Sequence, residues 1–386
     1  MEFNTDIAEL TRRFGTAGFP LFAVGGCVRD KILDTEPDDV DLATSASTED
    51  MERVLGGLSM DFQGKSFGVM YVNMDQDVYQ IATFRKDSPG RKPTVETGVS
   101  IEIDAFRRDF SCNAIYFDLI NKNIVDPTGG VADIKNKILR TPGKPGISLG
   151  DDPLRKLRAL RFGSTLDFKF DETLHEALLS DNSLIFTDAD GVSERVSQER
   201  IWMEFAKAVV KSKDAAVFLR LCQKYSMFDV MFPSINFAKH PLFFNSKSVE
   251  AVLAGLIGPV DMETPTDSLM EAKMSEDQAR GALLLSRLWL LDHTNVKTFH
   301  RMLRSTDMQP QTLRWFAHIA RAAMDEKAPD IHKVEAFLRF EPTLAEPLIA
   351  DGWKQGKPLG DELMRLDGEQ FLELEEKSRQ TKTSAL

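Results

Sequence analysis

The spacing of hydrophobic residues changes partway along the chain, and the change separates two kinds of structure. Up to about residue 135, short apolar runs alternate with polar turns, which predicts short strands mixed with helices. The strands are expected at 21–24, 39–42, 68–73, 78–84 and 114–119. Beyond a Gly- and Pro-rich linker at 143–146 the spacing turns helical, as in the expected helix 196–210. The pattern therefore predicts an α+β N-terminal part with a mostly antiparallel sheet, followed by an all-α remainder.

Residues 25–41 contain a glycine turn that is a candidate phosphate site. The apolar run before Gly25 and Gly26 predicts a strand, and the residues after them have helical spacing. A glycine turn lets backbone N–H groups approach a ligand closely, and a helix N-terminus favours anions. The turn could therefore hold a triphosphate, with Arg29 as an added cation.

Asp39 and Asp41 are candidate metal ligands. If they lie in a strand, its period of two puts both carboxylates on one face. Two such charges about 4 Å apart repel by roughly 1 kcal/mol in water, and a divalent cation would reverse that cost. Oxygen donors without a nearby histidine suit Mg²⁺. Such a pair alone is more often a polar turn entering a strand, and the glycine turn upstream is what favours the metal site.

Residues 106–114 combine guanidinium, carboxylate and amide groups. Asp109 and Asn113 are four residues apart, which predicts that they share one helical face, and Arg108 directly precedes them. Such groups can hold ribose hydroxyls and phosphates. An ordinary charged helix start is the alternative.

Residues 151–162 predict an amphipathic helix. Its leucines form a stripe that would face the core, Pro153 suits its first turn, and Asp152 lies at its N-terminal end. A second face carries Arg155, Arg158 and Arg161. Without further information, three such arginines indicate a solvated basic surface.

These segments resemble the class II tRNA nucleotidyltransferases (CCA-adding enzymes) and bacterial poly(A) polymerases, within the DNA polymerase β-like superfamily. The similar blocks are LFAVGGCVRDKILDTEPDDVDLATSA from residue 21, RRDFSCNA at 107–114, DPTGGVADIKNKILR at 126–140 and DDPLRKLRALRF at 151–162. The resemblance implies a nucleotidyltransferase catalytic head over 1–135, a helical neck with a base-recognition helix over 136–210, and a helical RNA-binding body and tail over 211–386.

The resemblance also gives the candidate residues their roles. It implies that Asp39 and Asp41 are catalytic and hold Mg²⁺, and that Asp152 and Arg155 form an amino-acid template for the incoming base. A carboxylate acceptor beside a guanidinium donor matches the pairing edges of cytosine and adenine, and opposes those of guanine and uracil. The remaining substrate-binding candidates are Gly25, Gly26, Arg29, Arg108, Asp109, Asn113, Arg158 and Arg161.

The implied function is template-independent addition of CMP and AMP from CTP and ATP to the 3′ end of tRNA, by two-metal nucleotidyl transfer. The alternatives are a poly(A) polymerase, a partial CC- or A-adding enzyme, and a catalytically inactive RNA-binding protein. Gln80 stands where many relatives have a glutamate, and the segment 84–98 is a few residues shorter than the family's flexible loop. The sequence therefore leaves open whether a third acid lies at the metal site and whether the protein adds the final AMP.

Composition narrows the setting. A formal charge of −12 over 386 residues argues against indiscriminate nucleic-acid binding, and basic residues gather instead between 135 and 161. The three cysteines are too few and too scattered for a disulfide framework or a zinc site, which predicts a reducing, cytoplasmic setting. No apolar run reaches the roughly 18 residues of a membrane span, and no protein partner is implied.

Overall fold

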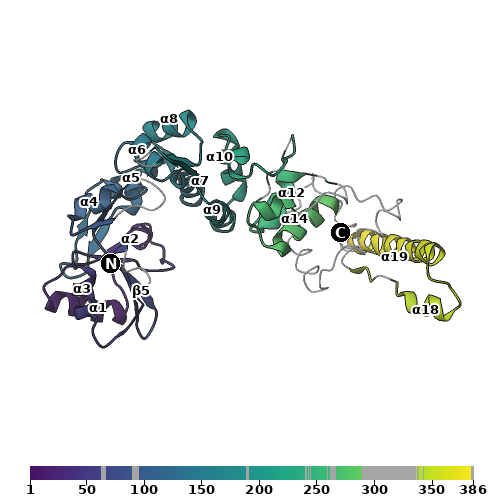
Figure 1. Cartoon of the computed structure of the whole chain (residues 1–386), viewed down its shortest axis with the longest axis horizontal. Coiled ribbons are helices and arrows are strands. Elements are labelled where there is room, and N and C mark those ends of the chain that lie inside the picture. The colour runs from purple at the N-terminus through teal and green to yellow at the C-terminus, as the bar shows by residue number, and fades with distance from the viewer. Residues whose placement is uncertain are drawn as a thin grey trace. The chain divides into compact units, whose positions relative to one another are not determined.

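The computed structural model describes most of the chain (Figure 1). The described residues are 1–61, 67–88, 95–187, 191–239, 241, 243, 245–258, 260, 267–288, 336, 339–341 and 343–383.

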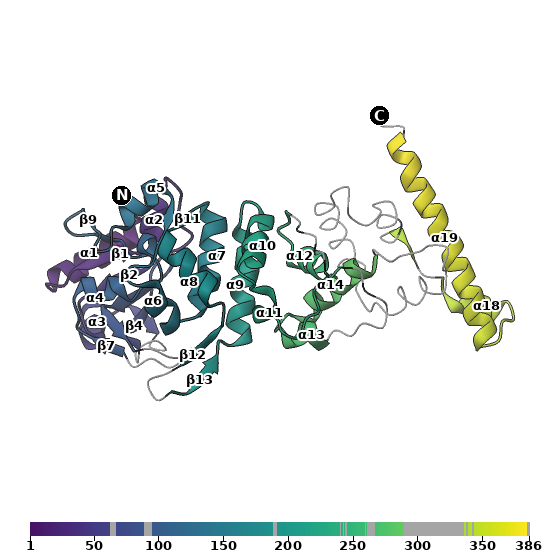
Figure 2. The ribbon, with the colours of Figure 1, turned by 90° about the horizontal axis from the view of Figure 1, so that it is seen from above.

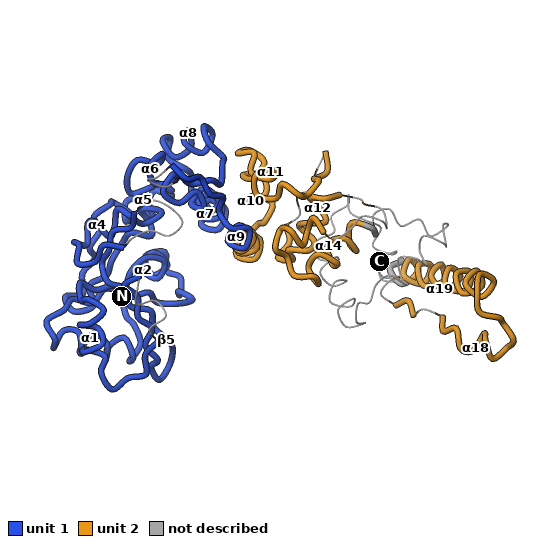
Figure 3. The backbone as a smooth tube through the Cα atoms, viewed as in Figure 1, with its two compact units in different colours: residues 1–201 blue, residues 202–386 orange. Residues whose placement is uncertain are grey.

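The chain divides into two compact units, residues 1–201 and 202–386 (Figure 3). The division falls within helix α9 (Gln198–Lys211). The segment 143–146, which the sequence predicts to be a linker, lies instead inside the first unit, because helix α6 begins at Pro145. The division into head, neck, and body with tail stays a prediction.

The first unit is built on a mixed sheet that is mostly antiparallel, as the sequence predicts. Among the described residues the sheet has seven strands in the order β3-β4-β5-β2-β1-β8-β9, and the pair β2–β5 alone in it is parallel. Figure 2 labels β1, β2, β4 and β9 of this sheet. Its strands are β1 (Leu21–Val24), β2 (Leu42–Thr44), β3 (Ser59–Asp61), β4 (Val69–Asn73), β5 (Val78–Thr83), β8 (Tyr116–Asp118) and β9 (Ile124–Val125).

Helices and three short strand pairs complete the first unit. The helices are α1 (Thr5–Thr16), α2 (Gly26–Ile32), α3 (Thr48–Val54), α4 (Ile101–Phe106), the 3₁₀ helix η2 (Ser111–Asn113), α5 (Gly130–Asn136), α6 (Pro145–Asp151), α7 (Leu154–Leu166) and α8 (Glu172–Ser180). The pairs are β6 (Arg85–Asp87) with β7 (Val95–Thr97), β10 (Ile138–Leu139) with β11 (Lys169–Phe170), and β12 (Ile185–Thr187) with β13 (Ser193–Arg195).

Aromatic side chains pack β1 and β8 against Phe84, the residue that follows β5. This packing stabilises the part of the sheet that carries the candidate site. The ring of Tyr116 meets Phe22 and Phe84 edge to face, with centroids 6.1 and 6.2 Å apart. All three rings are buried. Such pairs each contribute about 0.5–1.5 kcal/mol beyond the area that they bury.

The second unit is helical in its described part, which confirms the predicted change of class. After α9, its helices are α10 (Ala215–Lys224), α11 (Phe228–Met231), α12 (Val249–Ile257), α13 (Asp267–Glu271), α14 (Glu276–Leu288), α18 (Ala345–Ala350) and α19 (Lys357–Thr383). The apolar face of α9 is buried as predicted, with Phe205 packed on Phe218 and Phe232. Within the described ranges, no helix combines the length and the hydropathy needed to cross a membrane.

Candidate active site

The glycine turn forms as predicted and lies against Arg108. β1 ends at Val24, Gly25 adopts a φ of 80°, and α2 begins at Gly26. A side chain on Gly25 would have a strained backbone, and its Cβ atom would lie in ordinary contact with Nη1 of Arg108, at 3.5 Å. The turn therefore brings the backbone of residue 25 close to a fixed positive charge.

Asp39 and Asp41 lie just before β2 and not in a strand, which corrects the sequence prediction. β2 begins at Leu42, where its pairing with Ala23 of β1 ends, because β1 turns away at Gly25. The N–H of Val24 still donates to the carbonyl of Asp41 at 3.0 Å, which fixes Asp41 beside the glycine turn.

The charges of Asp39 and Arg108 act on the carboxyl group of Asp41. Burial raises the pKa of Asp41, the negative charge of Asp39 raises it further, and the Arg108 guanidinium opposes both effects. The structure thus brings together three predicted site residues: two acids that repel each other and one arginine. Relief of that repulsion is what a divalent cation would offer.

Gln80 lies on the strand next to Asp41. β2 and β5 pair in parallel with Leu42 opposite Ile81, so the preceding residues, Asp41 and Gln80, are neighbours in the same register. No group of three or more His, Cys, Asp or Glu side chains suited to a metal occurs among the residues with described positions. The candidate metal site therefore consists of two carboxylates, and Gln80 lies on the neighbouring strand.

A buried acid that the sequence analysis missed holds Arg108 in place. Asp104 is 1% exposed, and its Oδ2 accepts hydrogen bonds from the Tyr116 hydroxyl at 2.6 Å and from Nη2 of Arg108 at 3.1 Å. Its Oδ1 accepts from Nε of Arg107 at 2.9 Å. The sequence did contain a signal for this contact, because Asp104 lies three residues before Arg107 and four before Arg108.

Asp109 and Asn113 meet, but not on one helical face as predicted. α4 ends at Phe106, and Oδ1 of Asp109 accepts the N–H of Phe110 at 2.8 Å, a local bond that competes with helix formation. Nδ2 of Asn113 nevertheless donates to Asp109 at 3.1 Å, and Nη1 of Arg29 donates to Asn113 at 2.6 Å.

Arg158 completes this chain of contacts from α2 to α7. Its Nε donates to Oδ2 of Asp109 at 2.9 Å. Burial alone would raise the pKa of Asp109, but the charge of Arg158 and its hydrogen bond lower that pKa to about 2. Arg29, Arg158 and Arg161 all lie over the ring of Phe162, with guanidinium carbons 5.3, 5.5 and 4.1 Å from its centroid.

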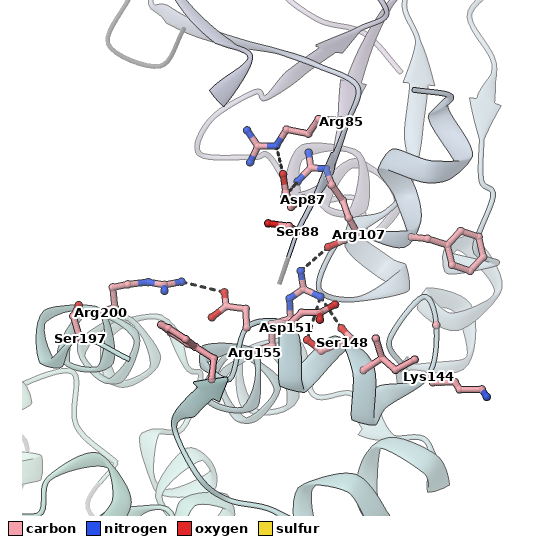
Figure 4. A pocket seen from close by; sticks show the side chains of 15 residues that line it. Arg85, Asp87, Ser88, Arg107, Lys144, Ser148, Asp151, Arg155, Ser197 and Arg200 are labelled. Atoms are coloured by element: carbon pink, nitrogen blue, oxygen red, sulfur yellow. Dashed lines mark hydrogen bonds and ion pairs between the residues drawn. The ribbon is translucent and has the colours of Figure 1, made fainter. Parts of the chain in front are cut away.

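A pocket of about 710 Å³ in the first unit contains the predicted base readers (Figure 4). Asp152 and Arg155 line it together with several charged residues that the sequence analysis did not single out for the site: Arg85, Asp87, Arg107, Asp151 and Arg200. Asp39 and Asp41 are not among its lining residues. Neither are the two glycines of the turn.

Arg155 connects this pocket to the residues around Asp41. Its Nη2 donates to the carbonyl oxygen of Arg107 at 2.5 Å, and its Nη1 donates to Oγ of Ser148 at 2.7 Å. Arg107 directly precedes Arg108, whose charge acts on Asp41. The segment 107–109 is therefore common to the pocket, to the Asp109 network and to the acid pair.

The predicted basic surface between 135 and 161 is partly internal. Lys156 is 2% exposed, and its Nζ contacts Oδ2 of Asp181 at 2.6 Å and the carbonyl of Ser183 at 2.8 Å. Arg140 pairs with Asp133 at 2.7 Å. The buried Lys156 thus pairs with an exposed acid, because burial of an unpaired charge is costly.

Comparison with known proteins finds a family match within the first unit. Residues 21–140 match the family described as "Poly A polymerase head domain". The chain is 35% identical over 209 residues to the CCA-adding enzyme of Enterococcus faecalis, a match that covers 53% of this chain and 49% of that protein. It is 38% identical over 195 residues to the CCA-adding enzyme of Lactobacillus helveticus, with 50% and 46% covered. The matches thus span about half the length of these curated relatives.

Solved structures share the fold over nearly the whole chain. The Bacillus stearothermophilus CCA-adding enzyme in complex with CTP superposes with a TM-score of 0.66 at 22% identity, covering 99% of this chain and 100% of that one. The Thermotoga maritima CCA-adding enzyme complexed with tRNA gives 0.63 at 19% identity, covering 98% and 96%. At these identities the similarity concerns the fold, and it confirms the predicted α+β head followed by helices.

Proposed function

We propose that this chain, whose residues 21–140 match the poly A polymerase head domain family, is a nucleotidyltransferase that adds CMP and AMP to the 3′ end of tRNA. CTP and ATP would be its substrates, and pyrophosphate would be released. The relatives that it matches over about half their length are named CCA-adding enzymes, which supports this substrate class.

One observation carries the proposal: the segment 107–109 links an acid pair to a charged pocket. Arg108 acts on Asp41, Asp109 binds Arg158, and the carbonyl of Arg107 receives Arg155. One nucleotide needs such an arrangement, because its phosphates, its sugar and its base must be held at once in the geometry of attack. The arginines around Gly25 would bind the triphosphate, Asp109 and Asn113 the ribose, and Asp152 and Arg155 the base.

The residues present fit a divalent metal ion. Asp39 and Asp41 offer two mutually repelling carboxylates, the oxygen donors that Mg²⁺ prefers. Bound there, Mg²⁺ would stabilise the negative charge that develops on the attacking and leaving oxygens. Arg108 adds a fixed positive charge beside the same acids. Gln80 can offer an oxygen but cannot accept a proton, so the 3′-hydroxyl proton would leave to water.

Base choice would follow from hydrogen-bond pairing in the pocket. The carboxylate of Asp152 accepts and the guanidinium of Arg155 donates, which matches cytosine and adenine. Guanine or uracil would set a carbonyl against the acid and an N–H against the arginine, leaving buried polar groups unpaired. Such mismatches discriminate strongly between substrates.

The test uses tRNA transcripts that end before CCA, after C, and after CC, each with CTP, ATP or both. Sequencing of the new 3′ ends should reveal completion to CCA from every start when both nucleotides are present. Absence of any nucleotide addition, with Mg²⁺ supplied, would overturn the proposal.

A poly(A) polymerase is the second candidate, because the matched family carries that name. It predicts long adenosine tails on RNAs other than tRNA, which sequencing the 3′ ends of an unrelated transcript incubated with ATP would reveal. In either case we propose a cytoplasmic enzyme, since its RNA substrates are processed there.

A further inference from the structure

Both oxygens of the predicted base reader Asp152 are already engaged by the protein. Its Oδ1 accepts the N–H of Leu154 at 3.2 Å, and its Oδ2 accepts Nη2 of Arg200 at 3.0 Å. Arg200 lies 48 residues further along the chain, on α9, and lines the same pocket. Figure 4 labels Arg200 and marks this contact with a dashed line.

Two contacts on opposite oxygens fix the plane of the carboxylate. The terminal torsion of an aspartate is broad and roughly two-fold, so one backbone hydrogen bond leaves the group free to swing about its Cβ–Cγ bond. The second contact, from Arg200, removes that freedom. A carboxylate has lone pairs for about four hydrogen bonds, so an acceptor site remains for a base.

Unlike Asp152, Arg155 is oriented by contacts that do not involve α9. Its guanidinium is anchored by Ser148 of α6 and by the carbonyl of Arg107, without any contribution from α9. The acceptor and the donor of the template are therefore held by different elements. Loss of Arg200 would disturb the acceptor while the donor keeps its place.

We propose that Arg200 is a positioning residue that sets the base selectivity of the pocket by holding Asp152. This inference rests on the proposed function, and it assigns to α9 a part in choosing the nucleotide. Selectivity depends on the orientation of the Asp152 carboxylate. A base with an N–H on its pairing edge forms its full hydrogen bond only with a carboxylate held in one orientation. A carboxylate that rotates discriminates less between a base that presents an N–H and one that presents a carbonyl.

The first test compares kcat/KM for CTP and UTP on a tRNA that lacks CCA. Arg200→Ala should lower the CTP:UTP ratio by about ten-fold or more, since it weakens a charge-assisted contact of the reader. Arg200→Lys keeps the charge and one donor and should restore most of the ratio. Arg220→Ala is the matched control, because Arg220 forms an exposed pair with Asp214 at 3.6 Å and is not among the pocket's lining residues, and it should leave the ratio unchanged.

A double-mutant cycle separates positioning from a general structural effect. In an Asp152→Ala background the ratio should already be low, and adding Arg200→Ala should not change it further. An equal fall of kcat/KM for CTP and UTP in Arg200→Ala would overturn the inference. An independent further loss of selectivity in the double variant would also overturn it.

A binding measurement keeps the inference separate from the proposed function. If the unaltered protein transfers no nucleotide to RNA, the proposed function fails. Calorimetric titration of CTP and UTP into the protein and into Arg200→Ala then still tests the positioning role. The inference predicts a preference for CTP that Arg200→Ala diminishes, and equal preferences in both proteins would contradict it.

Discussion

At the scale of single residues, the candidate site consists of charged groups that hold one another in place. Asp104 fixes Arg108, Asp109 fixes Arg158, and Arg200 fixes Asp152. Asp41 differs, because burial and the negative charge of Asp39 raise its pKa. Fixed donors around an unrelieved acid pair are the arrangement expected where a charged ligand and a cation bind together.

Removal of either acid should abolish transfer and leave the fold intact. Asp39→Ala or Asp41→Ala should lower pyrophosphate release by at least about a hundred-fold, since charge stabilisation is the main contribution to such reactions. Glu36→Ala is the control, because this exposed acid of the same loop pairs with Lys31. Thermal unfolding should be unchanged in all three variants. An active double variant would contradict the assignment.

The Asp109–Arg158 pair should make stability depend on pH. The pKa of Asp109 in the folded protein, about 2, lies below its ordinary value of 3.8, so its contribution is present above pH 4 and is lost as pH falls toward 2. That contribution is about 2 kcal/mol. Denaturant unfolding of the protein and of Asp109→Asn should differ most near neutral pH and converge near pH 2. A difference independent of pH would contradict this expectation.

At the scale of elements, local patterns predicted strands and helices. Contacts between residues far apart in the sequence determined where individual side chains lie. Apolar runs correctly indicated β1, β4 and β5, and the leucine stripe of α7 is buried as expected. The acid pair was misplaced into β2 because strand periodicity cannot reveal that the partner strand turns away at Gly25. Lys156 was placed on the surface because its partner, Asp181, lies 25 residues away. No local pattern indicates Arg200 either.

The contact of α5 with the turn that carries Asn113 depends on a glycine. A Cβ atom on Gly130 would lie 2.1 Å from the carbonyl oxygen of Ser111, so Gly130→Ala should destabilise the protein by about 1–3 kcal/mol through overpacking. Gly146→Ala is the matched control, since no atom lies within 4 Å of the corresponding position in α6. Urea unfolding measures both. Equal effects of the two substitutions would refute this account of the contact.

At the scale of the whole molecule, fold class was predictable from the sequence, whereas no local pattern marks the boundary between the two compact units. The change from mixed to helical spacing anticipated a sheet-containing unit and a helical one. The boundary lies inside a continuous helix, α9, where no glycine or proline marks it. The Gly- and Pro-rich segment that resembled a linker lies within the first unit instead, because chain breakers also mark turns between packed helices.

Under the proposed function, the whole protein should distinguish the four nucleotides by their pairing edges. With a tRNA lacking CCA, CTP should be incorporated, ATP should follow after two cytidines, and UTP and GTP should be at least about a hundred-fold less efficient. The measurement is kcat/KM for each nucleotide on one RNA primer. Efficient use of UTP would refute the template role of Asp152 and Arg155.

The central claim is that one nucleotide spans the acid pair and the charged pocket through the segment 107–109. A crystal structure with Mg²⁺ and a non-hydrolysable CTP analogue tests it most directly. The account predicts the cytosine edge against Asp152 and Arg155, with the triphosphate and Mg²⁺ at Asp39 and Asp41. A nucleotide bound in the pocket with its phosphates directed away from these acids would contradict it.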